Sequence, residues 1–157
     1  MDFIHKLLIG LLLLAGVGAQ ALALGPDRIT GQRVDQLMAS DQQYRQTWHS
    51  VVRNEDQLPG WVTNLTGTSM PMHSVDQPGG KYLVGELCEA YDCTRHRLYV
   101  AFTWDKQKAY ALYVTVPEGL PPDQAPSRHA RLRWLGEPDD AVKSILDEEL
   151  RSDPSWF

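Results

Sequence analysis

The stretch Arg97–Val116, RLYVAFTWDKQKAYALYVTV, decides the fold. Its first part, Arg97–Trp104, alternates two sets of side chains, and Ala109–Val116 resumes the alternation after the polar turn Asp105–Lys108. A period of two is typical of β-strands, and two such runs joined by a short polar segment indicate a hairpin. We therefore expect the chain to contain an antiparallel sheet.

Further elements flank this hairpin on both sides. Lys81–Cys88 is a strand candidate before it, and Arg131–Leu135 is a short last strand after the proline-containing loop Pro117–Ser127. A final helix is predicted from Pro138-Asp139-Asp140 to about Leu150. Its start is indicated by the two aspartates, because acidic residues suit the positive N-terminal end of a helix.

An amphipathic helix is predicted over Arg28–Asn54, with apolar residues spaced three and four apart. Pro59 and Gly60 then break the helix and restart the chain as an extended segment. We expect three tryptophans in the core: Trp61, Trp104 and Trp134. The order helix, antiparallel strands, helix predicts an α+β sandwich with a central antiparallel sheet, an N-terminal helix and a C-terminal helix.

Residues 1–23 have the layout of a signal peptide. One lysine precedes the apolar stretch Leu7–Ala19, and small residues follow at positions suited to cleavage after Ala21 or Ala23. An uncleaved membrane anchor is the alternative, and Gln20 counts against it. We expect residues 24–157 to form one domain with no further membrane segment.

The sequence has two cysteines, Cys88 and Cys93, separated by four residues. In an oxidising compartment a disulfide is the simplest interpretation. A metal site would need further ligands, and redox pairs usually enclose two residues. Because this bridge would join cysteines so close in sequence, it would mainly fix the shape of the segment Glu89–Asp92. That loop is then either a contact device or a turn stapled for stability.

The charge balance limits the class of partner. The chain has 15 Lys and Arg against 20 Asp and Glu, a net charge of −5. Nucleic-acid binding needs a basic face, so an acidic balance argues against it. A basic protein partner suits this charge, because opposite charges speed association.

Several short motifs together resemble one family. They are Leu58-Pro59-x-Trp61-Val62, Tyr82-x-Val84, Cys88-x4-Cys93 with Asp92 before the second cysteine, and Arg97 in the next strand. This pattern resembles the Ivy family, inhibitors of vertebrate lysozyme found in the periplasm of Gram-negative bacteria. The resemblance spans about Val34 to Leu146.

The resemblance implies a periplasmic protein that is not an enzyme and needs no cofactor. Its fold would be an α/β sandwich whose sheet presents the loop at one end. The inhibitory loop would comprise Cys88, Glu89, Ala90, Tyr91, Asp92 and Cys93, closed by the Cys88–Cys93 disulfide. It would occlude the active-site cleft of a peptidoglycan-cleaving glycosidase, with a c-type lysozyme as partner. Whether the chain is a monomer or a homodimer stays open.

The loop departs from the typical family sequence Cys-Lys-Pro-His-Asp-Cys at three positions: Glu89, Ala90 and Tyr91. A phenol can donate to a carboxylate but does not become cationic, and Glu89 would add a negative charge facing the lysozyme's own carboxylates. The alternative function is therefore a paralogue that controls endogenous lytic transglycosylases, or a periplasmic binding module.

Other candidate sites have weaker support. His96 near Asp92 suggests general-base chemistry, but no nucleophile or metal motif accompanies the pair, so a surface histidine is the better interpretation. Asp147, Glu148 and Glu149 fit a solvated helix face. We expect no catalytic residue and no metal ligand.

Overall fold

The computed structural model describes residues 30–157. The signal-peptide prediction for residues 1–23, and the start of the predicted domain at residue 24, lie outside this range. Among the described residues, no helix has the length and apolar character needed to cross a membrane.

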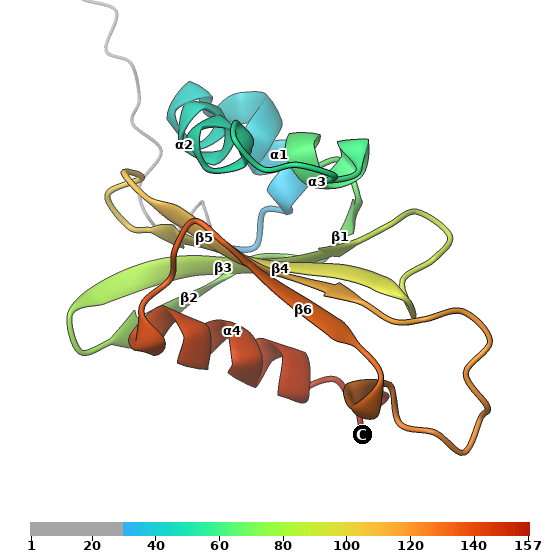
Figure 1. Cartoon of the computed structure of the whole chain (residues 1–157). Helices are drawn as coiled ribbons and strands as arrows, with labels where there is room; N and C mark the ends of the chain where they lie inside the picture. Colours follow the sequence, from blue (N-terminus) through green and yellow to red (C-terminus); the bar gives the residue numbers. More distant parts are fainter. Residues whose placement is uncertain (1–29) are drawn as a thin grey trace, which may run out of the picture.

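A six-stranded antiparallel sheet forms the centre of the molecule (Figure 1). The strand order is β1-β3-β4-β5-β6, and β2 also pairs with β3. The strands are β1 (Thr68–Ser69), β2 (His73–Gln77), β3 (Gly80–Cys88), β4 (His96–Thr103), β5 (Ala109–Thr115) and β6 (Arg131–Leu135). The predicted strands and the hairpin are confirmed to within one residue, whereas β1 and β2 were missed.

Both faces of the sheet are buried, which confirms the sandwich (Figure 1). Helices α1 (Val34–Ser40), α2 (Gln42–Val52) and α3 (Gly60–Asn64) cover one face, and α4 (Asp140–Arg151) covers the other. In β4, Leu98, Val100 and Phe102 pack under the first three helices, while Tyr99 and Ala101 pack under α4. The alternation seen in the sequence thus separates two apolar faces.

The single helix predicted over Arg28–Asn54 is wrong in two respects: helical structure begins only at Val34, and it is divided at Asp41. Asp41 has an extended backbone (φ −126°, ψ 112°), and its carboxylate accepts hydrogen bonds from the amides of Gln43 (2.9 Å) and Tyr44 (3.4 Å). Lys106, in the turn after β4, contacts the same carboxylate at 2.7 Å. An aspartate that caps a helix start is favourable, so the chain begins a second helix here.

The extended segment predicted after Pro59 is also wrong, because the short helix α3 begins at Gly60 with Pro59 as its N-cap. Proline fits the start of a helix, since its missing N–H would have no partner there. Val62 is fully buried, whereas Trp61 is half-buried and packs edge-on against Tyr113. Trp104 and Trp134 are half-buried at the borders of the core.

The C-terminal segment packs into the face that α4 covers. Asp139 caps α4 as expected, its carboxylate accepting from the Val142 amide at 2.9 Å. Beyond the helix the chain turns back, and Trp156 is only 6% exposed. Its carbonyl accepts from the Ser127 amide at 3.0 Å, next to the 3-10 turn Pro126–Arg128. Residues 152–157 therefore belong to the fold.

Gly136, directly after β6, gives a test of how closely the chain approaches the start of β5. It has φ +80°, and a Cβ there would lie 2.3 Å from the Ala109 carbonyl oxygen. Gly119 also has positive φ (+74°) but nothing within 4 Å of such a Cβ. We expect Gly136→Ala to lower the free energy of unfolding by about 3 kcal/mol and Gly119→Ala by about 1 kcal/mol. Urea unfolding of both variants checks this, and equal losses would contradict it.

Candidate functional site

The loop between β3 and β4 is closed by the Cys88–Cys93 disulfide, as predicted, with the two Cα atoms 4.8 Å apart. Cys88 is the last residue of β3 and pairs with Arg97 of β4. Beyond that pair, the Glu89 amide donates to the His96 carbonyl (3.1 Å), and the His96 amide donates to the Asp92 carbonyl (3.1 Å). The loop is therefore held at its base by both covalent and hydrogen bonds.

Tyr91 stands at the tip of this loop with its side chain fully exposed. Its backbone is in the left-handed region (φ 67°), which residues other than glycine rarely adopt. Among the described residues, no other large apolar side chain is as exposed. Ala90 beside it is also exposed. The loop thus presents one aromatic ring to solvent.

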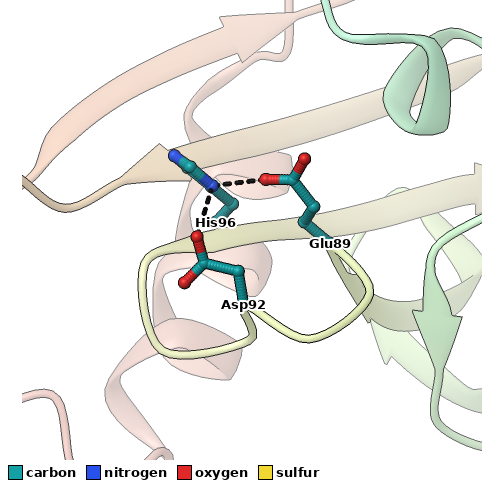
Figure 2. A group of neighbouring side chains, drawn as sticks. All are labelled: Glu89, Asp92 and His96. Atoms are coloured by element: carbon teal, nitrogen blue, oxygen red, sulfur yellow. Dashed lines mark ion pairs between the residues drawn. The ribbon is translucent and has the colours of Figure 1, made fainter. Parts of the chain in front are cut away.

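The charged residues of the loop turn back toward its base (Figure 2). Glu89 Oε2 lies 2.5 Å from His96 Nδ1, and Asp92 Oδ2 lies 3.3 Å from the same nitrogen. Glu89 is 39% exposed. The sequence predicted an outward Glu89 that would face the partner's carboxylates. The structure instead pairs it with His96, for which the sequence alone favours an ordinary surface histidine.

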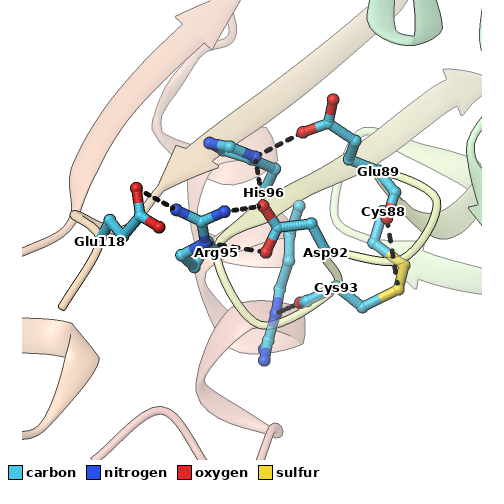
Figure 3. A network of polar contacts seen from close by, with 8 residues as sticks. Cys88, Glu89, Asp92, Cys93, Arg95, His96 and Glu118 are labelled. Carbon is cyan, nitrogen blue, oxygen red and sulfur yellow. Dashed lines mark hydrogen bonds and ion pairs between the residues drawn. A yellow bond between two sulfur atoms is a disulfide. The ribbon is translucent and has the colours of Figure 1, made fainter. Parts of the chain in front are cut away.

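Arg95 completes this network (Figure 3). Its guanidinium donates twice to Asp92, Nε to Oδ1 at 2.9 Å and Nη2 to Oδ2 at 2.6 Å. These hydrogen bonds hold the pKa of the Asp92 carboxyl below its ordinary value. On its other side Arg95 approaches Glu118, with Nη1 3.5 Å from Oε2. Both loop carboxylates thus have a basic partner within the chain.

Glu89, Asp92 and His96 are also a donor set that could hold a divalent cation, since one ligand atom from each lies within 4.8 Å of the others. The Arg95 guanidinium weakens this interpretation, because it occupies both oxygens of Asp92 and would repel a cation. We therefore interpret the three residues as an ion-pair network. No step of a mechanism requires a metal here.

The comparisons with known proteins agree with this geometry. The family model described as "Inhibitor of vertebrate lysozyme (Ivy)" matches residues 43–151, a range that contains the loop and both of its flanking strands. The chain belongs to the Ivy family.

Three relatives show how this Ivy chain compares with others. An uncharacterised protein of Pseudomonas aeruginosa is 54% identical over 145 residues, which cover 92% of this chain and 94% of that protein. The Pseudomonas aeruginosa protein named "Inhibitor of vertebrate lysozyme" is 40% identical over 114 residues, covering 72% and 74%. An uncharacterised protein of Yersinia pestis is 35% identical over 116 residues, covering 72% and 73%.

Arg97 connects the loop Cys88–Cys93 to the C-terminal segment. Its Nε donates to the Cys93 carbonyl at 2.7 Å, Nη1 forms an ion pair with Asp153, and Nη2 donates to Ser155 Oγ at 3.2 Å. The side chain is only 13% exposed. The sequence predicts that Arg97 lies in a strand, but no pattern along the chain predicts a role for the C-terminal residues. The structure makes this segment a support behind the loop.

Beneath Arg97 lie two further polar side chains of the sheet. Glu86 pairs with Tyr99 across β3 and β4. Burial raises the pKa of the Glu86 carboxyl, and the charge of Arg97 opposes that rise. Burial likewise raises the pKa of Tyr99 to about 12. Arg97 is thus the cation that offsets the cost of a desolvated carboxylate next to the loop.

The remaining acidic and histidine candidates lie apart from the loop. Glu149 contacts His73 at 3.0 Å, and Asp147 pairs with Arg151 at 2.5 Å on the outer side of α4. Glu148 is exposed. These groups form side-chain pairs on the surface, which agrees with the prediction of a solvated helix face.

Arg97→Gln tests the support behind the loop. It removes a mostly buried charge and leaves Asp153 and Glu86 without their cation, so we expect the free energy of unfolding to fall by about 2–3 kcal/mol. Amide exchange at Arg95 and His96, whose amides donate to the Asp92 carbonyl, should also become faster. Arg151→Gln, which breaks an exposed pair, is the control and should cost under about 1 kcal/mol. Similar losses in both variants would argue against a supporting role for Arg97.

Proposed function

We propose that this protein is a non-enzymatic inhibitor of a lysozyme, and that the loop Cys88–Cys93 enters the active-site cleft and blocks it. The observation that carries the proposal is the fully exposed Tyr91 on a loop held by a disulfide and hydrogen bonds. Membership of the Ivy family and the name of the 40% identical relative support it. The proposal includes export to the periplasm and removal of residues 1–23.

A pre-ordered loop suits this role for an energetic reason. Binding usually costs entropy, because the segments that make contact must be fixed in one conformation. Here the disulfide fixes the loop before it meets a partner. The hydrogen bonds donated by the Glu89 and His96 amides, and the hydrogen bond from Arg97 to the Cys93 carbonyl, add to this. Most of the free energy from burying Tyr91 is then available for affinity.

Tyr91 offers the chemistry that a glycosidase cleft can accept. A retaining glycosidase carries two carboxyl groups about 5 Å apart, one of them ionised. A phenol can donate a hydrogen bond to the ionised carboxylate, while its ring fills space that a sugar would occupy. Tyr91 lacks the positive charge of the imidazole in the typical family loop, so it relies on hydrogen bonding and burial.

The internal pairing of Glu89 and Asp92 removes an obstacle to this docking. Each carboxylate already has a partner, His96 for Glu89 and Arg95 for Asp92. The tip formed by Ala90 and Tyr91 carries no formal charge. Repulsion by the target's carboxylates is therefore weaker than the loop sequence alone suggests.

A second candidate target class is the lytic transglycosylases, which use a single catalytic acid. The uncharged tip favours this alternative, because a single phenol matches a single carboxyl group and a missing cation costs less there. The same inhibition assay applied to both enzyme classes distinguishes the two targets. Inhibition of neither class at micromolar excess would overturn the proposal and leave a periplasmic binding module as the remaining interpretation.

Tyr91→Ala is the direct test of the loop's role. The ring contacts nothing within the fold, so stability should be unchanged, while loss of an interface anchor should cost about 2 kcal/mol of binding, or roughly thirtyfold in inhibition constant. The measurement is the turbidity of a cell-wall suspension during enzymatic lysis. Met70→Ala, at another exposed apolar side chain, is the control and should inhibit like the wild type.

The double variant Glu89→Lys with Tyr91→His tests the chemistry at the tip. It restores a cation at each of two positions that the typical family loop provides. We expect stronger inhibition of a c-type lysozyme, because both groups are attracted to the cleft carboxylates. Unchanged or weaker inhibition would count against docking through this loop. The two single variants separate the contribution of each position.

A further inference from the structure

A hollow of about 350 Å³ lies beside the loop, at the edge where three strands begin or end. His96 starts β4, Thr115 ends β5 and Arg131 starts β6, and they are successive partners across the sheet. Arg95 and Glu118 are the other charged residues that line the hollow, besides Arg131. The hollow therefore adjoins the loop and faces the same end of the molecule.

The wall of this hollow carries two guanidinium groups against one carboxylate. Arg131 has no acidic side chain within ion-pair distance among residues 30–157. Arg95 uses Nε and Nη2 for Asp92, on the loop side, which leaves Nη1 toward the hollow. Asp92 thus satisfies much of Arg95 from the loop side, and Arg131 is the guanidinium of the hollow that has no acidic partner among the described residues.

Glu118 is the single acidic group of the hollow, and it is held loosely. Its side chain is 86% exposed, and its carboxylate lies 3.5 Å from Arg95 Nη1, farther than the 2.6 Å between Arg95 and Asp92 (Figure 3). An ion pair so exposed contributes little to stability. A carboxylate that also reached Arg131 would have two cations instead of one.

We propose that this hollow is a carboxylate-binding subsite, in which a ligand carboxylate takes the place of Glu118 between Arg95 and Arg131. The Arg131 guanidinium can present paired donors that match the two oxygens of a carboxylate, and Arg95, whose Nε and Nη2 donate to Asp92, would add Nη1. Such charge-assisted hydrogen bonds are strong. The volume is large enough for a group attached to the carboxylate, such as one sugar ring.

The source of the carboxylate rests on the proposed function. Peptidoglycan contains a sugar whose lactyl group ends in a free carboxylate wherever no peptide is attached, and an enzyme that binds the loop brings its own acidic side chains near the cleft rim. Both sources supply the same chemistry to Arg95 and Arg131. Two measurements distinguish them, one for a sugar carboxylate and one for an acidic side chain of a partner.

The first measurement is an NMR titration of the wild-type protein with N-acetylmuramic acid, with N-acetylglucosamine as the matched sugar that lacks the carboxylate. Shifts at the amides of His96, Thr115 and Arg131 with the acid alone would support a sugar carboxylate. The second is the inhibition constant for an enzyme that the wild type inhibits. It reports on an acidic side chain of the partner.

Three variants give the decisive pattern. Arg131→Gln should weaken binding about tenfold, whereas Glu118→Gln should strengthen it severalfold, because it removes the internal competitor. Arg128→Gln makes the same charge change outside the hollow and should act like the wild type. Variants of the hollow that change affinity in opposite directions, in either measurement, support the proposal. A general loss of stability would move both the same way.

The outcomes separate this proposal from the proposed function. Arg131→Gln that matches Arg128→Gln in both measurements would overturn the subsite. If the wild type inhibits neither enzyme class, the proposed function fails and the titration alone decides. In that case, no difference between the acidic and the neutral sugar would also overturn the subsite.

Discussion

The antiparallel pairing of β3 with β4 is the constraint on which the rest of the structure depends. Its register places Leu87 opposite Leu98 and Cys88 opposite Arg97. A slip of one residue would move every side chain to the other face, and both faces are buried, so the register is strongly specified. The end of this ladder fixes where the chain must turn, and hence where the disulfide-closed loop projects. The disulfide closes only a short loop, worth about 2 kcal/mol in the chain-entropy model, so it shapes the loop more than it supports the fold.

The charges at the end of this ladder are arranged in two layers. In the outer layer, His96 and Arg95 pair with the loop carboxylates Glu89 and Asp92. In the inner layer, Arg97 links the Cys93 carbonyl to Asp153 and lies over Glu86 and Tyr99. Both layers fix the base of the loop, and neither places a charge at its tip. The tip formed by Ala90 and Tyr91 is thus uncharged, while the carboxylates of the loop lie against His96 and Arg95 at its base.

The sequence predicted most of the sheet and the position of the loop, but not the loop's internal contacts. Strands β3 to β6 and helix α4 carry strong periodic patterns, and they lie where expected. Strands β1 and β2 are short and polar, and only their pairing with β3 makes them strands. At Asp41 the capping hydrogen bonds are local, and the contact of its carboxylate with Lys106 comes from a residue distant in sequence. The turn of Glu89 toward His96 likewise depends on the backbone of the closed loop. Contacts between residues brought together by folding leave no pattern along the chain.

The conformation of Tyr91 brings these constraints together. A left-handed backbone at a residue with a large side chain costs about 1–2 kcal/mol, so the free loop would avoid it. It persists because the residues on both sides are fixed. The disulfide holds Cys88 and Cys93, and backbone hydrogen bonds join Glu89 and Asp92 to each other and to His96. The ring projects from a backbone that is already fixed, and it is fully exposed to solvent. A loop backbone held in this way does not have to be ordered on binding, so the entropic cost of an encounter falls mainly on the Tyr91 side chain.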